Sequence, residues 1–231
     1  MGDKRISSVY SNQEGVHEDL VESINKHLQS PWRQPTPDHT QKAAIEIIEL
    51  IDQHRGPLIL DSFCGTGMST AALAELFPDS LVIGIDKSLN RLSKHVPGAS
   101  RNYHLFRASC EHVWAALAKE EICVDRHYLL YPNPWPKKAH LKRRIHGHPA
   151  FPLLRTLGGV VQLRSNWLTY VEEFAFGMQL LHFHSQISEV HTTDPLTLFE
   201  RKYSENKENL WQCESIPLKE AGADHDDCGT V

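Results

Sequence analysis

Two aspartates in this sequence follow short apolar runs, a position from which a carboxylate can bind a ligand. Asp61 follows the run Leu58–Leu60, and Asp86 follows the run Leu81–Ile85. Such runs are typical of buried parallel strands, whose carboxyl ends meet at one edge of a sheet. At that edge the second carboxylate is placed to bind the hydroxyls of a ribose. The two acids therefore predict a nucleotide-type ligand.

The turn after Asp61 narrows the choice of ligand. Gly65 and Gly67 allow the backbone to turn tightly and to approach a bound molecule. The third glycine of a dinucleotide fingerprint is missing, and an acid before the glycines would repel a pyrophosphate. The same acid suits a cationic group, such as the ammonium and sulfonium of S-adenosylmethionine. The alternative interpretation is an ordinary glycine turn without a ligand.

The elements that would position these residues follow from the apolar periodicity. Helical and strand patterns alternate along the chain, which predicts an α/β fold with helices on both faces of the sheet. Helices are expected over 20–28, 41–52, 69–76, 89–92 and 111–117, and strands over 58–60, 81–85, 103–107, 124–131 and 157–163.

A rigid loop and a run of positive charge follow the fourth expected strand. Residues 133–136 read NPWP, and two prolines fix the backbone around the tryptophan. The next eight residues carry five positive charges and no acid, although the net charge of the chain is −5. These cations are Lys137, Lys138, Lys142, Arg143 and Arg144. A basic patch beside a ligand pocket indicates a phosphate backbone as partner, and the alternative is a solvated helix face.

The motifs together resemble a known family. DSFCGTG followed by GID is similar to the first two motifs of class I methyltransferases. PNPWPKKAHLKRR resembles the signature PDPWPKKRHHKRR of the tRNA (guanine-N7-)-methyltransferase family, and TLFE from Thr197 resembles its closing T-x-F-E motif. The resemblance runs from about residue 41 to Trp211. It implies a Rossmann-like class I fold with a mostly parallel seven-stranded sheet, S-adenosylmethionine as cofactor, and tRNA as substrate.

The resemblance also implies roles for particular residues. The cofactor is expected at Asp61, Gly65, Gly67, Asp86, Lys87, Ser109 and Cys110. The guanine is expected at Asn133, Thr197 and Glu200. The RNA is expected at Lys137, Lys138, His140, Lys142, Arg143, Arg144 and Asn166.

Two positions depart from the family pattern. Asn133 stands where the family has its loop aspartate, and Asn166 replaces the aspartate of a later motif. An amide offers one acceptor oxygen and two donor hydrogens, so it cannot accept as a carboxylate does. Three functions stay open: a tRNA methyltransferase, a methyltransferase acting on a small molecule or another nucleobase, and a non-catalytic RNA-binding homologue.

Length and composition bound the organisation of the chain. Its 231 residues suit one core, with an N-terminal extension over 1–40 that holds a short helix and a proline-rich connector, a methyltransferase domain over 41–215, and an acidic, disordered tail over 216–231. Five cysteines without CxxC spacing predict neither a disulfide framework nor a metal site. The lack of a membrane-spanning run or a signal peptide predicts a cytoplasmic protein. Monomer and homodimer stay open.

Overall fold

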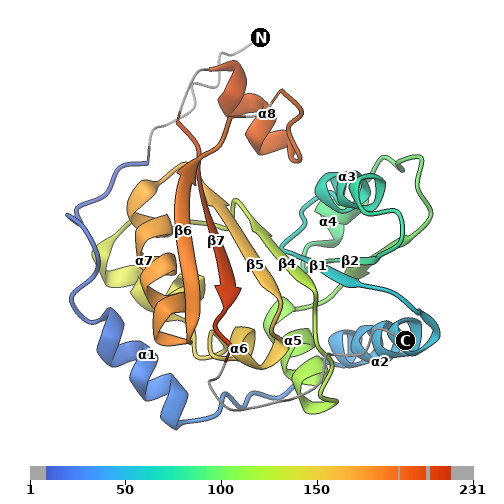
Figure 1. Ribbon diagram of the computed structural model, residues 1–231, viewed down its shortest axis with the longest axis horizontal. Helices are drawn as coiled ribbons and strands as arrows, with labels where there is room; N and C mark the ends of the chain where they lie inside the picture. Colours follow the sequence, from blue (N-terminus) through green and yellow to red (C-terminus); the bar gives the residue numbers. More distant parts are fainter. Residues whose placement is uncertain (1–8, 192, 207–208, 220–231) are drawn as a thin grey trace.

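The computed structural model describes residues 9–191, 193–206 and 209–219, which form a seven-stranded sheet with helices on both faces (Figure 1). The strand order is β3-β2-β1-β4-β5-β7-β6, in which β7 runs antiparallel to β5 and β6 and the other pairs are parallel. The strands are β1 (Leu58–Ser62), β2 (Leu81–Asp86), β3 (Tyr103–Arg107), β4 (Arg126–Leu130), β5 (Val160–Ser165), β6 (Phe183–Glu189) and β7 (Trp211–Pro217). The predicted α/β class and mostly parallel sheet are confirmed.

Eight α-helices and two short 3₁₀ helices, η1 and η2, connect the described strands or flank them. They are α1 (Leu20–Gln29), α2 (Asp38–Gln53), α3 (Met68–Leu76), α4 (Leu89–Leu92), α5 (Cys110–Lys119), η1 (Lys138–Arg143), η2 (Ile145–Gly147), α6 (Leu153–Leu157), α7 (Leu168–Leu180) and α8 (Leu198–Glu205). No helix in the described part of the chain is both long enough and apolar enough to span a membrane.

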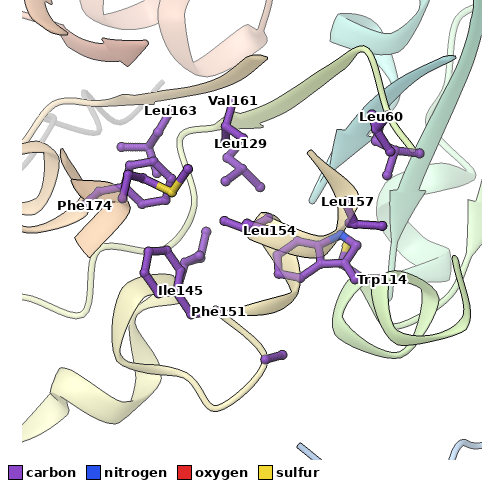
Figure 2. Packing of buried hydrophobic residues seen from close by; sticks show 14 of the residues in the cluster. Leu60, Trp114, Leu129, Ile145, Phe151, Leu154, Leu157, Val161, Leu163 and Phe174 are labelled. Carbon is purple, nitrogen blue, oxygen red and sulfur yellow. The ribbon is translucent and has the colours of Figure 1, made fainter. Parts of the chain in front are cut away.

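The central strands β1 and β2 are buried along their whole length, as continuous apolar runs in a parallel sheet predict. Ile59 of β1 packs with Leu73 of α3 in a smaller cluster. Its neighbour Leu60 points to the opposite face and joins Trp114 of α5 in the main core. Figure 2 shows this main core, where side chains of α5, α6 and α7 meet those of β1, β4 and β5.

Helix α1 is part of the main core. Its Leu20 and Ile24 are fully buried, and α1 packs against α7. Val21 and Leu28 of the same helix are apolar but exposed. Val21 directly follows Leu20, so a helix turns it away from the buried stripe.

The predicted start of one strand is wrong. The strand expected from residue 157 begins at Val160, because Leu157 ends α6 and the next two glycines both have φ of 67°. Only glycine fits at Gly159, where a Cβ would lie 1.8 Å from a backbone oxygen of Val124. The tail expected from residue 216 overlaps the end of β7, which extends to Pro217. The part of that tail from 220 to 231 lies outside the described residues.

Candidate active site

The glycine turn lies at the carboxyl end of β1, beside the point where the strand order reverses between β1 and β4. Gly65 and Gly67 have φ of 64° and 77°, which the preceding turn requires. A Cβ at Gly67 would lie 2.5 Å from Leu105, whereas a Cβ at Gly65 would meet no atom within 4 Å. Gly67 is therefore needed for packing, and Gly65 faces open space in which a ligand could lie against the backbone.

Asp86 ends β2 and faces this turn. Its Oδ2 accepts a hydrogen bond from the backbone N–H of Gly65 at 3.0 Å, and its Oδ1 accepts from Ser88 at 2.7 Å. Arg91 also contacts Oδ1 at 2.9 Å through a half-exposed side chain. The carboxylate is thus fixed at the turn, and the exposed guanidinium is the contact that a ligand hydroxyl could replace.

Asp61 is fully buried at the end of β1. Its Oδ2 accepts hydrogen bonds from Ser69 at 2.6 Å and Thr70 at 2.7 Å, while Oδ1 has no described partner. Burial raises the pKa of Asp61 to about 6, although the two hydroxyls favour the ionised form. An unpartnered buried oxygen suits a cationic ligand group, so this residue fits the ammonium end of S-adenosylmethionine.

The other expected cofactor residues lie near this turn, with different exposure. Lys87 is exposed directly after β2. Ser109 precedes α5, and its hydroxyl donates to Glu111 at 2.7 Å, so it is already engaged. Cys110 is buried, its thiol lies against the N–H of Phe63 at 3.3 Å, and burial raises the pKa of the thiol well above its ordinary value. Cys110 therefore serves packing and holds the turn.

The NPWP loop leaves β4 at the neighbouring position of the same edge. Asn133 is exposed, and its Oδ1 accepts weakly from the N–H of Trp135 at 3.3 Å. Trp135 has φ of 45°, a conformation that a bulky residue adopts only where its surroundings impose it. Arg143 lies over the indole at 4.8 Å, and His140 packs on its edge at 5.5 Å.

Arg144 corrects one prediction. It was expected to contact phosphates, but its side chain is fully buried and pairs with the equally buried Glu173 of α7, with Nη1 to Oε2 at 2.5 Å. The same guanidinium donates to the backbone oxygens of Trp135 at 3.2 Å and Lys137 at 3.3 Å. Arg144 therefore holds the loop from inside and is not available to RNA.

Glu173 gathers several further donors. His146 Nε2 lies 2.9 Å from Oε2, and Gln13 and the N–H of His17 contact Oε1 at 2.6 and 2.9 Å. Burial favours the neutral carboxyl, but the hydrogen bond from His146 and the charge of Arg144 outweigh it and lower the pKa of Glu173 to about 2. The cluster ties the N-terminal segment, α7 and the loop together.

Glu200 is buried, and both of its oxygens are engaged. Arg164 of β5 donates from Nη1 to Oε1 at 2.7 Å, and the N–H of Leu196 donates to Oε2 at 3.2 Å. Thr197 accepts from the N–H of Glu200 at 3.0 Å, which makes Thr197 the cap of α8. Arg164 Nε has no described partner, and the hydroxyl of Tyr131 at the end of β4 also has none.

The remaining residues expected to contact RNA are all at least partly exposed. Asn166 directly follows β5 and is partly exposed. Lys137, Lys142 and Arg143 are exposed, and Lys138 is half-exposed and pairs with Glu18 at 3.0 Å.

The fold and the two carboxylates at the ends of β1 and β2 define a class I methyltransferase. The profile of the family described as "Putative methyltransferase" (Methyltransf_4) matches residues 55–213. The chain is 27% identical over 176 residues to the tRNA (guanine-N(7)-)-methyltransferase of Geobacillus kaustophilus, covering 71% of this chain and 80% of that protein. It is 30% identical over 178 residues to the enzyme of the same name from Alcanivorax borkumensis, covering 67% and 70%. The chain belongs to this methyltransferase family, which confirms the resemblance of the motifs.

A solved structure supports the fold. The 16S rRNA (adenine(1408)-N(1))-methyltransferase from Catenulisporales acidiphilia matches with a TM-score of 0.54 and 16% identity, and the match covers 81% of this chain and 96% of that chain. A mutant of the same enzyme, determined with cosubstrate SAM, matches with a TM-score of 0.56 and 16% identity. That second match covers 78% of this chain and 93% of the mutant chain.

The sequence patterns did not indicate the roles of Glu173 and Arg164. Glu173 lies in the largely apolar helix α7, and an acid on a buried helical stripe is a signal that could have been used. Arg164 lies in an alternating strand, where its side chain resembles any outward-facing cation. Its partner Glu200 lies in α8, 36 residues away, so only the folded structure reveals the pair.

Proposed function

We propose that this protein transfers a methyl group from S-adenosylmethionine to N7 of a guanosine in tRNA. The observation that carries the proposal is the position of two sites at one edge of the sheet. The glycine turn with Asp86 ends β1 and β2, and the loop with Asn133 ends the adjacent β4. The relatives named tRNA (guanine-N(7)-)-methyltransferase support this substrate.

The residues at the turn fit the cofactor. Asp86 would accept hydrogen bonds from the ribose hydroxyls. Gly65 has no side chain, so the ligand can lie against the backbone there. The unpartnered oxygen of Asp61 would face the ammonium group. The bound cofactor supplies an electrophilic methyl group on a positively charged sulfur. The chain contributes position and charge complementarity.

Methylation at guanine N7 requires little acid–base catalysis by the protein. N7 carries a lone pair in the plane of the ring and no proton, so no strong general base is required. The rate gain must come from holding the base in line with the methyl group. The NPWP loop suits that task, because the buried Arg144 donates hydrogen bonds to its backbone and so limits its movement.

Arg164 and Glu200 provide a means of holding the guanine. Guanine presents the acceptor O6 beside the donors on N1 and N2, and adenine presents the opposite order. The side chain of Arg164 is 14% exposed and Glu200 engages only its Nη1, so the guanidinium can still donate to O6. Glu200 is buried and acts by orienting Arg164, while Thr197 fixes the helix that carries Glu200.

Asn133 is the exposed side chain of the loop and completes this arrangement. Its amide oxygen can accept from the guanine N1 or N2 hydrogens, since it makes only one long hydrogen bond to Trp135. The exposed cations beside it, Lys137, Lys142 and Arg143, would contact the phosphates of tRNA.

The test is a methylation assay with labelled S-adenosylmethionine and an unmodified tRNA transcript, followed by nucleoside analysis. We expect label in 7-methylguanosine and its loss in Asp86→Ala, with Arg101→Ala as an exposed control away from the turn. Label in a different nucleoside, or none with a protein that binds the cofactor, would reject the proposed function.

A further inference from the structure

A cavity of about 860 Å³ lies between α1, the proline-rich connector after it, and η1. It is separate from the glycine turn, because its walls come from the N-terminal segment and from the helix that follows the NPWP loop. Four cations of different segments line it: Lys26, Arg33, Lys138 and Lys142.

The positive charge of this cavity is only partly neutralised. Lys138 pairs with Glu18 at 3.0 Å, but Lys26, Arg33 and Lys142 form no ion pair with any described residue. Asp19 and Glu22 also line the cavity, but the four cations outnumber these two acids, so the lining is positive on a chain with a net charge of −5.

The walls are fixed by hydrogen bonds between the segments. His27 of α1 lies 3.2 Å from the backbone oxygen of Gly147, and His17 lies 3.2 Å from that of Lys138. Burial lowers the pKa of His27, and the charges of Lys26 and Lys142 lower it further. The two walls of the cavity are thus held together, and cations of both walls line it.

The cavity is continuous with the proposed RNA surface. Lys138 and Lys142 lie on the cavity side of η1, while Arg143 of the same helix lies over Trp135 in the loop. Helix α1 packs beside α7 (Figure 1) and also contacts η2, so the N-terminal segment adjoins the basic run. Trp32 also lines the cavity.

We propose that this cavity binds the sugar–phosphate backbone of the RNA substrate at nucleotides beyond the methylated one, an inference that rests on the proposed function. Unpaired cations on both walls of the cavity suit phosphate oxygens. The volume accommodates one or two nucleotides, within the ordinary range of about 300–1,000 Å³ for ligand pockets. The N-terminal segment is therefore part of the substrate site.

The test reverses the charge of Lys26 and Arg33, which line the N-terminal wall of the cavity and are not part of the family signature. Lys26→Glu/Arg33→Glu is compared with Arg101→Glu/Lys119→Glu, which changes the net charge equally at exposed positions that do not line the cavity. Affinity for an unmodified tRNA transcript is measured by fluorescence anisotropy over a range of salt. We expect at least about tenfold weaker binding, and a salt slope reduced by about 1.5–2, for the cavity variant.

Equal tRNA affinity of the two double variants would overturn the inference, and the cavity would then serve another partner, such as an acidic protein segment. A selective loss in the cavity variant supports it, whether or not the unaltered protein forms 7-methylguanosine. Failure of the proposed function would show as tRNA binding without that product, so the two failures are distinguishable. At saturating tRNA we expect the cavity variant to keep its kcat, with the defect in KM.

Discussion

The buried cluster around Glu173 allows a quantitative prediction. Glu173→Gln keeps the size of the side chain but leaves the guanidinium of Arg144, which is fully buried, without a described counter-charge. Removing one partner of a buried ion pair costs about 3–5 kcal/mol. The lowered pKa of Glu173 gives a similar figure, since a fall from 4.5 to about 2 corresponds to about 3 kcal/mol.

The assay is urea unfolding of the two proteins at pH 7 and at acid pH. A carboxyl with a lowered pKa contributes its stability above its unfolded pKa of 4.5, and this contribution disappears as the pH falls towards 2. The free energy of unfolding of Glu173→Gln should therefore be about 3 kcal/mol lower at pH 7, or roughly 10 °C in Tm, and the gap should narrow near pH 3.

A double variant separates stability from loop positioning. Replacing Arg144 and Glu173 both by Met fills the volume without a buried charge and should restore most of the stability. Methyl transfer should stay impaired, because the backbone oxygens of Trp135 and Lys137 lose their donor. A Glu173→Gln variant within about 1 kcal/mol of the unaltered protein at pH 7, or a gap that does not change with pH, would refute this reasoning.

Three further predictions concern the turn and the base site. Asp61→Asn should keep or raise Tm at pH 7.5, since the raised pKa of about 6 means that the buried charge opposes folding above that pH, yet calorimetry should show cofactor affinity reduced at least tenfold. Asp86→Ala should weaken cofactor binding about a hundredfold, because charge-assisted hydrogen bonds are worth about 1.5–3 kcal/mol each, and unchanged binding would remove the ribose assignment. Arg164→Lys should retain the pair with Glu200 but lose the other guanidinium donors, which lowers kcat/KM for tRNA about tenfold at nearly constant Tm. Equal kinetics of the two proteins would exclude a contact from Arg164 to the base.

The sequence was most informative where local chemistry and fold coincide. Asp86 and the glycine turn could be placed from apolar runs and glycine spacing, because an acid at the carboxyl end of a parallel strand lies at the edge of the sheet where ligands bind. The same logic located the NPWP loop at the neighbouring strand end. The family signature then supplied the expected roles.

Charges in the basic run could not be sorted from the sequence. The five cations within residues 137–144 cannot be distinguished from the sequence. In the structure, the two consecutive 3₁₀ helices turn Arg144 inward to Glu173 and leave Arg143 exposed. Which cation is buried depends on an acid 29 residues away in α7. Likewise, the engagement of Glu200 depends on Arg164 from another element, a contact that only tertiary packing determines.

The central claim is methylation at N7 of guanosine, and replacing that atom tests it most directly. Two tRNA transcripts, one with ordinary guanosine and one with 7-deazaguanosine, differ at the acceptor atom while keeping the Watson–Crick edge that Arg164 and Asn133 would contact. With labelled S-adenosylmethionine, we predict label in the ordinary transcript, none in the 7-deaza transcript, and similar affinity for both. Equal labelling of the two transcripts would contradict the claim and place the methyl group on a different atom.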